Sequence, residues 1–363
     1  MKLLVGEGNC SDAEHIYTDA WFIVTQFSIV IINTIGLTFC SCLCFFILIS
    51  QLFHINLRIL LTNLYGAMAL RTICTSFRSA SSLWAAFTYS DPCAFLHSSE
   101  HCALNAAICA LPLSAVLDSF LAIAVERIIA LLFYCKYERL RIPLVALILV
   151  PATWVRATVT LVDSLSTSSP KHKMMAYCSS LVATTTFNLA RLLDVTLPLL
   201  ILSAFTFAII HIVCTIKLRL HLSRSVENLS ARYQLRENVR STKLFATASV
   251  LYSIIMATNI TIYAFLAASN TLSLKTIAIL KEASSLVSIP IFMLIWSFLF
   301  LRMMPYFRER ILRLIFRPSS PFRFRHSAVS FTLSTAHHMT ILNATWAGQT
   351  RNLSSKLGIM HGY

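Results

Sequence analysis

The chain has 363 residues, of which 57% are hydrophobic and only 12% are charged, and its formal net charge is +15. A soluble globular domain carries about 25% charged residues, so this composition excludes an ordinary soluble protein and indicates a membrane protein. The positive charge by itself would suggest nucleic acid, but the placement of the basic residues explains it, and we expect no nucleic-acid partner.

Seven stretches of the chain are apolar and long enough to cross a bilayer, which takes about 20 residues of helix. The second stretch is the weakest, because Arg71 and several Ser and Thr residues interrupt it. The sequence therefore predicts an all-α membrane protein, a seven-transmembrane helix bundle. The predicted spans are residues 21–50, 57–79, 102–133, 142–163, 187–216, 242–268 and 276–301.

The basic residues are distributed unevenly between the two sides of these spans. With the N-terminus outside, nine of the 30 Lys and Arg residues lie outside or within the membrane, and the other 21 lie on the cytoplasmic side. The segment 217–243 alone carries seven of them. This positive-inside asymmetry predicts a multi-pass plasma-membrane protein with an extracellular N-terminus, residues 1–20, and a receptor-like domain, residues 21–301.

The residues after the last span suggest a different structure. "RMMPYFRERILRLIFRP" places Met304, Phe307, Ile311 and Leu314 on one helical face, with most arginines elsewhere. This pattern is typical of a short amphipathic surface helix, which we expect at residues 302–317. The Ser/Thr-rich remainder, residues 318–363, has little periodicity and is predicted to be a disordered cytoplasmic tail.

Four cysteines fall on the predicted outer side, where oxidising conditions favour pairing. Cys102 opens the third span and Cys178 lies in the loop after the fourth, so a bond between them would tie this loop over the bundle. Cys93 competes for either position, and the partners of Cys10 and Cys93 stay open. On the same side Asn9 begins the sequon Asn-Cys-Ser, and we expect Asn9 to be glycosylated.

An adjacent acid and base, Glu126 and Arg127, lie where the third span meets the cytoplasm. Charges at helix ends are commonly interface residues that reach into the headgroups. Alternatively, Arg127 is held by Glu126 and by Glu237 at the foot of the sixth span, and is released when the helix ends part. This second interpretation predicts a two-state latch.

Ionisable and polar residues inside the membrane are candidates for ligand binding. Arg191 and Asp194, three residues apart, would alternatively neutralise each other. Asp118 is interpreted as a structural hydrogen-bonding partner. The candidates for contact with a small-molecule ligand are Asn105, Cys109, Arg191, Asp194 and Glu282.

Several short motifs resemble a known family. "VERIIA" followed by "YE", "YQLREN" before the sixth span, "LFHINLRILL" after the first, and "DPC" at residues 91–93 are similar to nematode serpentine chemoreceptors of the Sra superfamily. They look most like the Srab class, with the Sre and Srb classes as alternatives. The seventh span lacks the Asn-Pro-x-x-Tyr motif of rhodopsin-like receptors, so their activation route is not carried over.

This resemblance implies a G-protein-coupled receptor for environmental chemicals that acts in sensory-neuron cilia. It implies as partners a heterotrimeric G protein, a small chemical ligand and the lipid bilayer. It also implies that the Glu-Arg pair and the motifs around it form the switch and the coupling surface. These residues are Glu126, Arg127, Tyr137, Glu138, Tyr233, Glu237 and Asn238.

A chain of this composition could also belong to two other function classes. A multi-pass transporter or channel is the alternative, but the intramembrane charges are too few and too scattered to draw a polar path. Motifs of membrane enzymes, such as His-Glu-x-x-His and Gly-x-Ser-x-Gly, do not occur in the sequence, and we expect neither catalysis, nor a cofactor, nor a metal.

Overall fold

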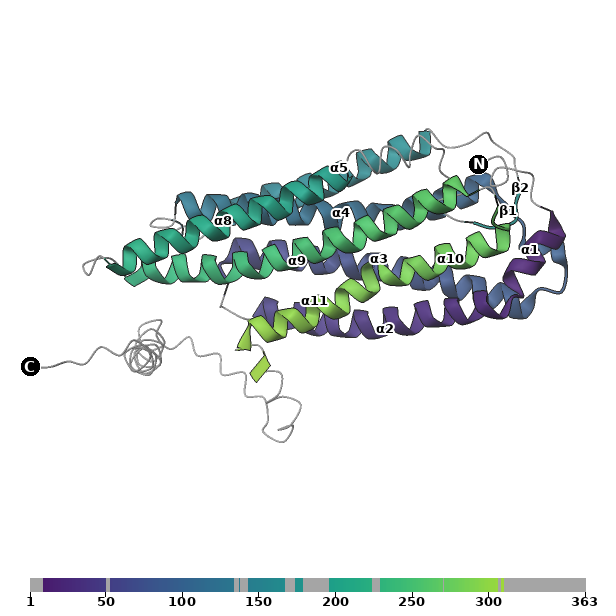
Figure 1. Cartoon of the computed structure of the whole chain (residues 1–363), viewed down its shortest axis with the longest axis horizontal. Helices are drawn as coiled ribbons and strands as arrows, with labels where there is room; N and C mark the ends of the chain where they lie inside the picture. Colours follow the sequence, from purple (N-terminus) through teal and green to yellow (C-terminus); the bar gives the residue numbers. More distant parts are fainter. Residues whose placement is uncertain are drawn as a thin grey trace, which may run out of the picture. The chain divides into compact units, whose positions relative to one another are not determined.

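Helices that run lengthwise beside one another form the bundle, as Figure 1 shows. The computed structural model describes residues 9–49, 53–133, 137, 143–166, 174–178, 196–223, 229–269, 271–305 and 308–309. Of the two compact units in the chain, Met1–Arg308 contains the bundle, and only one residue of Glu309–Tyr363 is described.

Seven helical spans make up the bundle, and the seventh consists of two helices. The spans are α2 (Ala20–Ile49), α3 (Ile55–Thr88), α4 (Ser99–Leu132), α5 (Leu144–Ser166), α8 (Leu197–Ser223), α9 (Leu229–Ala268) and the pair α10 (Leu274–Val287) and α11 (Ile289–Met303). Six of these spans are long and apolar enough to cross a membrane by composition. The remaining span is α3, which the sequence marks as the weakest. The predicted seven-helix membrane fold is therefore confirmed.

Small elements gather at one end of the bundle. They are α1 (Cys10–Tyr17), the 3-10 helix η2 (Pro92–Phe95), and the strands β1 (His97–Ser98) and β2 (Met174–Met175), which pair antiparallel with His97 opposite Met175. A buried apolar cluster joins them to the ends of α2, α4, α9 and α10, with Tyr17, Phe22, Phe95 and Leu266 among its members. We call this end the disulfide end, after the bonds Cys10–Cys93 and Cys102–Cys178 that lie in it.

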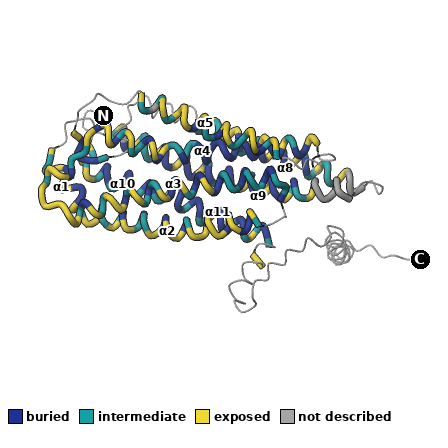
Figure 2. The backbone as a smooth tube through the Cα atoms, turned by 180° about the vertical axis from the view of Figure 1, so that it is seen from behind, coloured by how far each residue is buried: buried dark blue, intermediate teal, exposed yellow. Residues whose placement is uncertain are grey.

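The helix α4 is the centre of the bundle. It contacts α3, α5, α8 and α9, and α2 closes the ring by contacting α3, α10 and α11. About 61% of the apolar stretch of α4 is buried, against 17% for α5, so α4 faces protein while α5 faces outward. Figure 2 shows this difference as dark blue positions along α4 and many yellow positions along α5.

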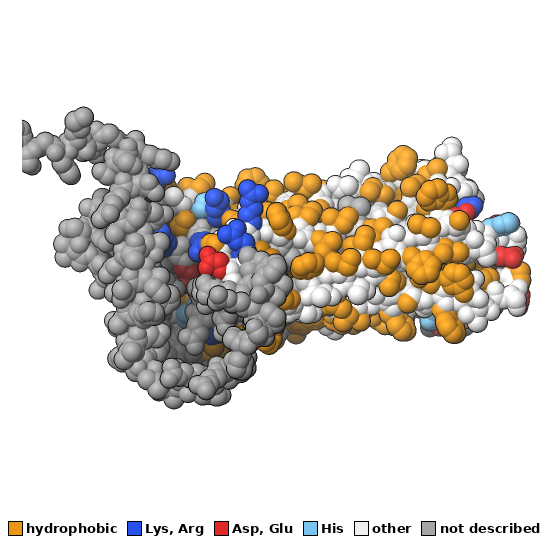
Figure 3. Space-filling model, turned by 90° about the horizontal axis from the view of Figure 1, so that it is seen from below, with side chains coloured by type: hydrophobic (Ala, Val, Ile, Leu, Met, Phe, Trp, Pro, Cys, Tyr) orange, Lys and Arg blue, Asp and Glu red, His pale blue; other side chains and the backbone are white. Residues whose placement is uncertain are grey.

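The exposed flank of the bundle is strongly apolar. Large hydrophobic side chains such as Phe27 on α2, Phe77 on α3 and Ile148 on α5 are exposed. Figure 3 shows hydrophobic side chains covering one flank, with Lys and Arg gathered toward one end. An apolar flank of this size is unfavourable in water and fits a surrounding bilayer.

The structure corrects two details of the predicted spans. The segment 217–241 is predicted as a loop, but α8 continues to Ser223 and α9 begins at Leu229, thirteen residues before the predicted sixth span. Residues 229–241 contain neither Gly nor Pro and are rich in good helix formers, which explains the extension.

The seventh span is also interrupted. It ends as α10 at Val287 and resumes as α11 at Ile289, with Ser288 at φ −74° and ψ −114° between them. Pro290 lacks the backbone N–H that would bond to residue 286, and its ring clashes with that carbonyl, so a continuous helix is disfavoured there. Of the predicted surface helix 302–317, Arg302 and Met303 still belong to α11, which ends before Met304, and Pro305, Arg308 and Glu309 are helical. Residues 306–307 and 310–317 and the tail 318–363 lie outside the described residues.

Candidate functional site

Arg127 lies buried at the end of α4 that is remote from the disulfides, with 1% of its surface exposed. Its Nε and Nη2 donate hydrogen bonds of 2.5 and 2.6 Å to the two carboxylate oxygens of Glu126, which is fully buried. Its Nη1 donates to Asn238 Oδ1 at 2.8 Å and to Ser241 Oγ at 3.2 Å, both on α9. One guanidinium thus joins α4 to α9, and the pair is buried within the bundle.

Tyr137, in the segment after α4, holds the other side of the same carboxylate. Its hydroxyl donates a 2.5 Å hydrogen bond to Glu126 Oε1 and accepts one of 3.1 Å from Asn56 Nδ2 on α3. Burial, and then the charge of Glu126, raise the pKa of Tyr137, so the phenol stays a donor. Asn56 Oδ1 accepts from the backbone N–H of Ala146 on α5 at 3.3 Å. We call this chain of contacts, from Ser241 to Ala146, the Arg127 network.

The Arg127 network includes several of the residues predicted to form the latch. Asn238, which the family motif supplies, is a direct partner of Arg127, and Glu237 lies beside it, within electrostatic reach of Arg127. The described cross-helix hydrogen bonds of Arg127 therefore go to neutral groups. Glu138 lies outside the described residues, as does the side chain of Tyr233.

The disulfide end carries two cross-links. Cys102 at the start of α4 is bonded to Cys178, and Cys10 of α1 is bonded to Cys93 of η2. The Cys102–Cys178 bond was predicted. The Cys10–Cys93 bond pairs the two cysteines whose partners the sequence leaves open. Asn9 is exposed and caps α1 by accepting from Ser11 N–H at 3.4 Å, so the sequon lies next to a cross-link.

Glu282 on α10 points into the bundle near this end, with 1% of its surface exposed. Arg78 on α3 donates two hydrogen bonds of 2.9 and 2.7 Å to its two oxygens, and Lys281 Nζ donates one of 3.1 Å. The Tyr177 hydroxyl also donates to Glu282, and burial and the Glu282 charge raise its pKa, which keeps it protonated. Because Tyr177 precedes Cys178, the Cys102–Cys178 bond positions one of the three partners of Glu282.

The other ligand candidates are placed differently. Asn105 on α4 is partly exposed and lies 3.4 Å from the ring nitrogens of His101 one turn earlier. Cys109 is buried, and its backbone oxygen accepts a 2.6 Å hydrogen bond from Arg71 on α3. Arg191 and Asp194 lie outside the described residues.

Asp118 forms an ion pair with Arg156 of α5, whose side chain is 42% exposed on the bundle flank. It is therefore a structural partner between two helices, as expected, and not part of an inner site. Nearby, Asn63 of α3 donates to Ser119 and accepts from Trp154, which adds neutral contacts among α3, α4 and α5.

Sequence reasoning missed several residues of both networks. Asn56 and Ser241 are ordinary polar residues near helix ends, and nothing in their spacing marks them. Arg78 carried a usable signal, because a cation at the end of a weakly apolar span needs a buried partner. Tyr177 was marked only by its place beside a cysteine.

Comparison with known proteins places the chain in a receptor family. The family described as "Serpentine type 7TM GPCR receptor class ab chemoreceptor" matches residues 7–315 of this chain. A relative from Caenorhabditis elegans, "Serpentine receptor class alpha/beta-14", is 26% identical over 256 residues, which cover 69% of this chain and 64% of the relative. The chain thus spans less than two thirds of that relative's length.

The seven-helix membrane bundle is that of a serpentine seven-transmembrane receptor. The chain belongs to the class ab family of serpentine seven-transmembrane chemoreceptors. This confirms the predicted resemblance to the Srab class over the Sre and Srb classes. The family is one of receptors and not of enzymes.

Proposed function

We propose that the chain is a chemosensory receptor that binds an environmental small molecule and activates a heterotrimeric G protein. The disulfide end faces outward, with the N-terminus extracellular, and the Arg127 network faces the cytoplasm. Two features support this orientation: cross-links form in oxidising surroundings, and the exposed Arg236, Arg240 and Lys243 lie at the opposite end, as positive-inside placement requires. By this orientation Asn9 is available for glycosylation.

The observation that carries the proposal is the burial of Arg127 between α4 and α9. A buried guanidinium with a chelating carboxylate and two partners on a second helix holds these helix ends together. Parting of the ends would break both bonds to α9 and expose Arg127 to a cytoplasmic partner. The arrangement thus describes the closed member of a two-state switch.

The test is expression of the receptor with a promiscuous G protein, with calcium as the signal, against volatile and water-soluble odorants. We expect at least one compound to give a concentration-dependent response that requires the G protein. Arg127→Ala at matched surface expression should lose this response, and Thr247→Ala, an exposed change on α9, should keep it. A compound-dependent current that persists without G protein would instead favour a channel.

A further inference from the structure

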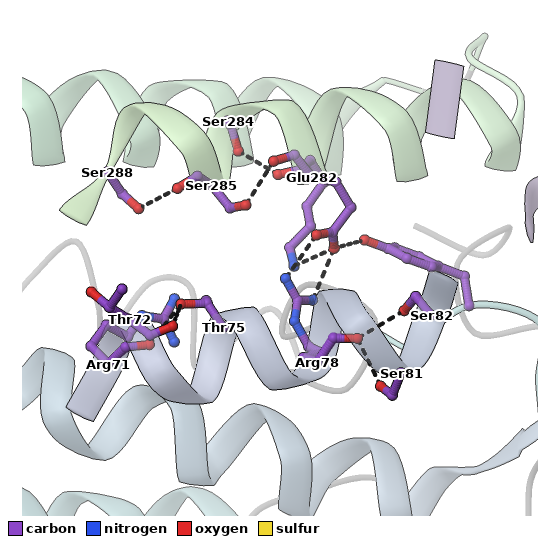
Figure 4. A network of polar contacts seen from close by, with 12 residues as sticks. Arg71, Thr72, Thr75, Arg78, Ser81, Ser82, Glu282, Ser284, Ser285 and Ser288 are labelled. Atoms are coloured by element: carbon purple, nitrogen blue, oxygen red, sulfur yellow. Dashed lines mark hydrogen bonds and ion pairs between the residues drawn. The ribbon is translucent and has the colours of Figure 1, made fainter. Parts of the chain in front are cut away.

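The described polar contacts around Glu282 leave an excess of positive charge inside the bundle. Figure 4 shows Arg78 on α3 and Glu282 on α10 pointing toward each other, with Arg71 further along α3. Glu282 has two cationic partners, since both Arg78 and Lys281 bond to it. These two cations and one carboxylate have a net charge of +1. All three groups are largely buried.

Arg71 adds a third cation to the same region. It lies seven residues before Arg78, two helical turns or about 10.5 Å along α3, on the same helix face. Its described hydrogen bond goes to a neutral group, the backbone oxygen of Cys109, and its charge acts on Lys281. Among the described ion pairs, Asp19 is engaged with Lys275 and Asp118 with Arg156. Arg78 and Lys281 therefore share one carboxylate, Glu282, and the described ion pairs include none for Arg71.

Polar atoms without a hydrogen-bond partner lie at the same level. Cys40 Sγ donates to Tyr65 O at 3.5 Å, which fixes the register of the antiparallel helices α2 and α3. Counted from the Cys40–Tyr65 pair toward the disulfide end, seven residues along each helix lead to Asn33 on α2 and Thr72 on α3, at about the same level. Seven residues more lead to Gln26 on α2 and Ser79 on α3. Asn33, Gln26 and Ser79 are buried, and in the described structure each has a side-chain polar atom without a hydrogen-bond partner.

Buried cations and unpaired polar atoms are both costly in a low-dielectric interior, and an incoming anion would relieve both costs. A carboxylate suits guanidinium and ammonium groups, because charge-assisted hydrogen bonds to it are short and directional. The surroundings favour an apolar remainder. Ile277 and Ala278, four and three residues before Lys281 on α10, belong to the same buried apolar cluster as Phe22 of α2 and Leu266 of α9.

We propose that the cluster of Arg71, Arg78, Lys281 and Glu282 is the ligand site and that it takes small carboxylic acids as their anions, with an apolar body. Lys281 and Arg71 meet the carboxylate, whereas Arg78 remains bound to Glu282. This inference rests on the proposed receptor function, because it names the ligand class of that receptor. Its test below measures binding without a G protein, so the two ideas can fail separately.

The experiment is thermal unfolding of the purified full-length receptor in lipid nanodiscs. The probes are hexanoate, octanoate and benzoate. Hexan-1-ol, methyl hexanoate and hexylamine are the neutral and cationic counterparts of hexanoate. A ligand that binds the folded state raises the unfolding midpoint by mass action, and we expect at least one acid to raise it by about 5 °C. The alcohol, ester and amine should leave it unchanged.

Variants assign the effect to the site. Lys281→Gln leaves the Arg78–Glu282 pair balanced, so the unliganded midpoint should stay or rise, while the acid concentration for half of the shift should increase about tenfold or more. Arg71→Gln should weaken the acid in the same direction, and Lys281→Arg should retain it. Lys275→Gln is the matched control, because Lys275 lies on the same helix but pairs with Asp19.

Two outcomes overturn the inference. One is a panel in which no acid raises the midpoint, or in which amine or neutral compounds raise it as much. The other is a Lys281→Gln protein whose unliganded midpoint falls while the acid shift is unchanged, since Lys281 would then serve only to hold the fold. Either result leaves the G-protein response to odorants, and hence the proposed function, to be judged by its own experiment.

Discussion

Tyr137 donates a 2.5 Å hydrogen bond to Glu126, the residue that chelates Arg127, so a residue outside the spans completes the buried ion pair. A carboxylate with three short donors on its two oxygens is well solvated by protein. The pair can therefore stay buried at a place where isolated charges would not. Asn56, bound to the same phenol, links the pair to α3, so α3, α4 and α9 meet through one set of charges.

Removing this hydroxyl should weaken the closed state. Tyr137→Phe deletes one donor to Glu126 and leaves the Asn56 amide without its acceptor, which should cost about 1–3 kcal/mol of unfolding free energy. We expect a lower thermal midpoint for the purified receptor. Tyr89→Phe, at a partly exposed ring of the disulfide end, serves as the control and should change stability by about 0.5 kcal/mol or less. Equal stability of the two variants would remove Tyr137 from the network.

Glu237 tests the latch from the α9 side. Its charge attracts Arg127 toward α9, and a partly buried contact of this kind contributes about 0.5–2 kcal/mol to the closed state. Glu237→Gln should therefore raise ligand-free signalling by a few-fold up to about thirtyfold, because 1.4 kcal/mol changes the population ratio tenfold. Asn238→Leu, which removes a direct hydrogen bond to Arg127, should raise it in the same direction.

The measurement is basal G-protein activity at matched surface expression, with Thr247→Ala as the unaltered comparison. If neither Glu237→Gln nor Asn238→Leu changes basal activity, the contacts of Arg127 with α9 hold the fold but do not set the resting state. The proposal of a latch would then be withdrawn.

The bond between Cys102 and Cys178 should matter for stability and for ligand response alike. Removing a native disulfide typically costs about 2–5 kcal/mol, and here it also frees Tyr177 from its place beside Glu282. Cys102→Ser and Cys178→Ser should lower surface expression and ligand response, while Cys42→Ser, an exposed free thiol on α2, should not. Mass spectrometry of unreduced peptides showing free Cys102 and Cys178 would contradict the pairing.

Acid should loosen the disulfide end through His97. Burial, and then the nearby His101 ring at 5.7 Å, hold the pKa of His97 below its usual 6.5. A depressed pKa means that the unfolded chain takes up the proton more readily, so this stabilisation is present above pH 6.5 and is lost as pH falls through the lower folded value. The thermal midpoint should drop between about pH 7 and about pH 5, and His97→Gln should reduce the drop. An identical pH profile for the variant would exclude His97 as its source.

The fold was predictable because a bilayer imposes a simple rule on sequence. Each span needs about 20 mostly apolar residues, and even the span that Arg71 interrupts meets this length. Helix ends in water follow no such rule, which is why the extension of α9 below residue 242 was missed. The interruption at Ser288 was missed because a proline within a membrane helix usually gives only a kink.

The charged residues of the candidate site could be predicted from the sequence, because a charge within the membrane is costly. Their neutral hydrogen-bond partners could not be predicted in this way. Glu126, Arg127 and Glu282 stood out, because an ionised group in an apolar span requires an explanation. Asn56, Asn238 and Ser241 are as common at span ends as in loops, and only the family motif marked Asn238. The partner of Glu282 across the bundle, Arg78, depends on the register of α3 against α10, which no local pattern encodes.

The interruption at Ser288 means that the seventh span is not one rigid rod. Glu282 lies on α10 and the buried Trp296 on α11, so a displacement of α10 does not travel to α11 through a continuous ladder of backbone hydrogen bonds. Mechanical transmission between the two ends then depends on side chains beside the joint, such as Thr72 of α3, whose hydroxyl lies 3.1 Å from Met293 Sδ. The packing of side chains at this joint, more than the stiffness of either helix, would then determine how strongly a movement of α10 is coupled to a movement of α11.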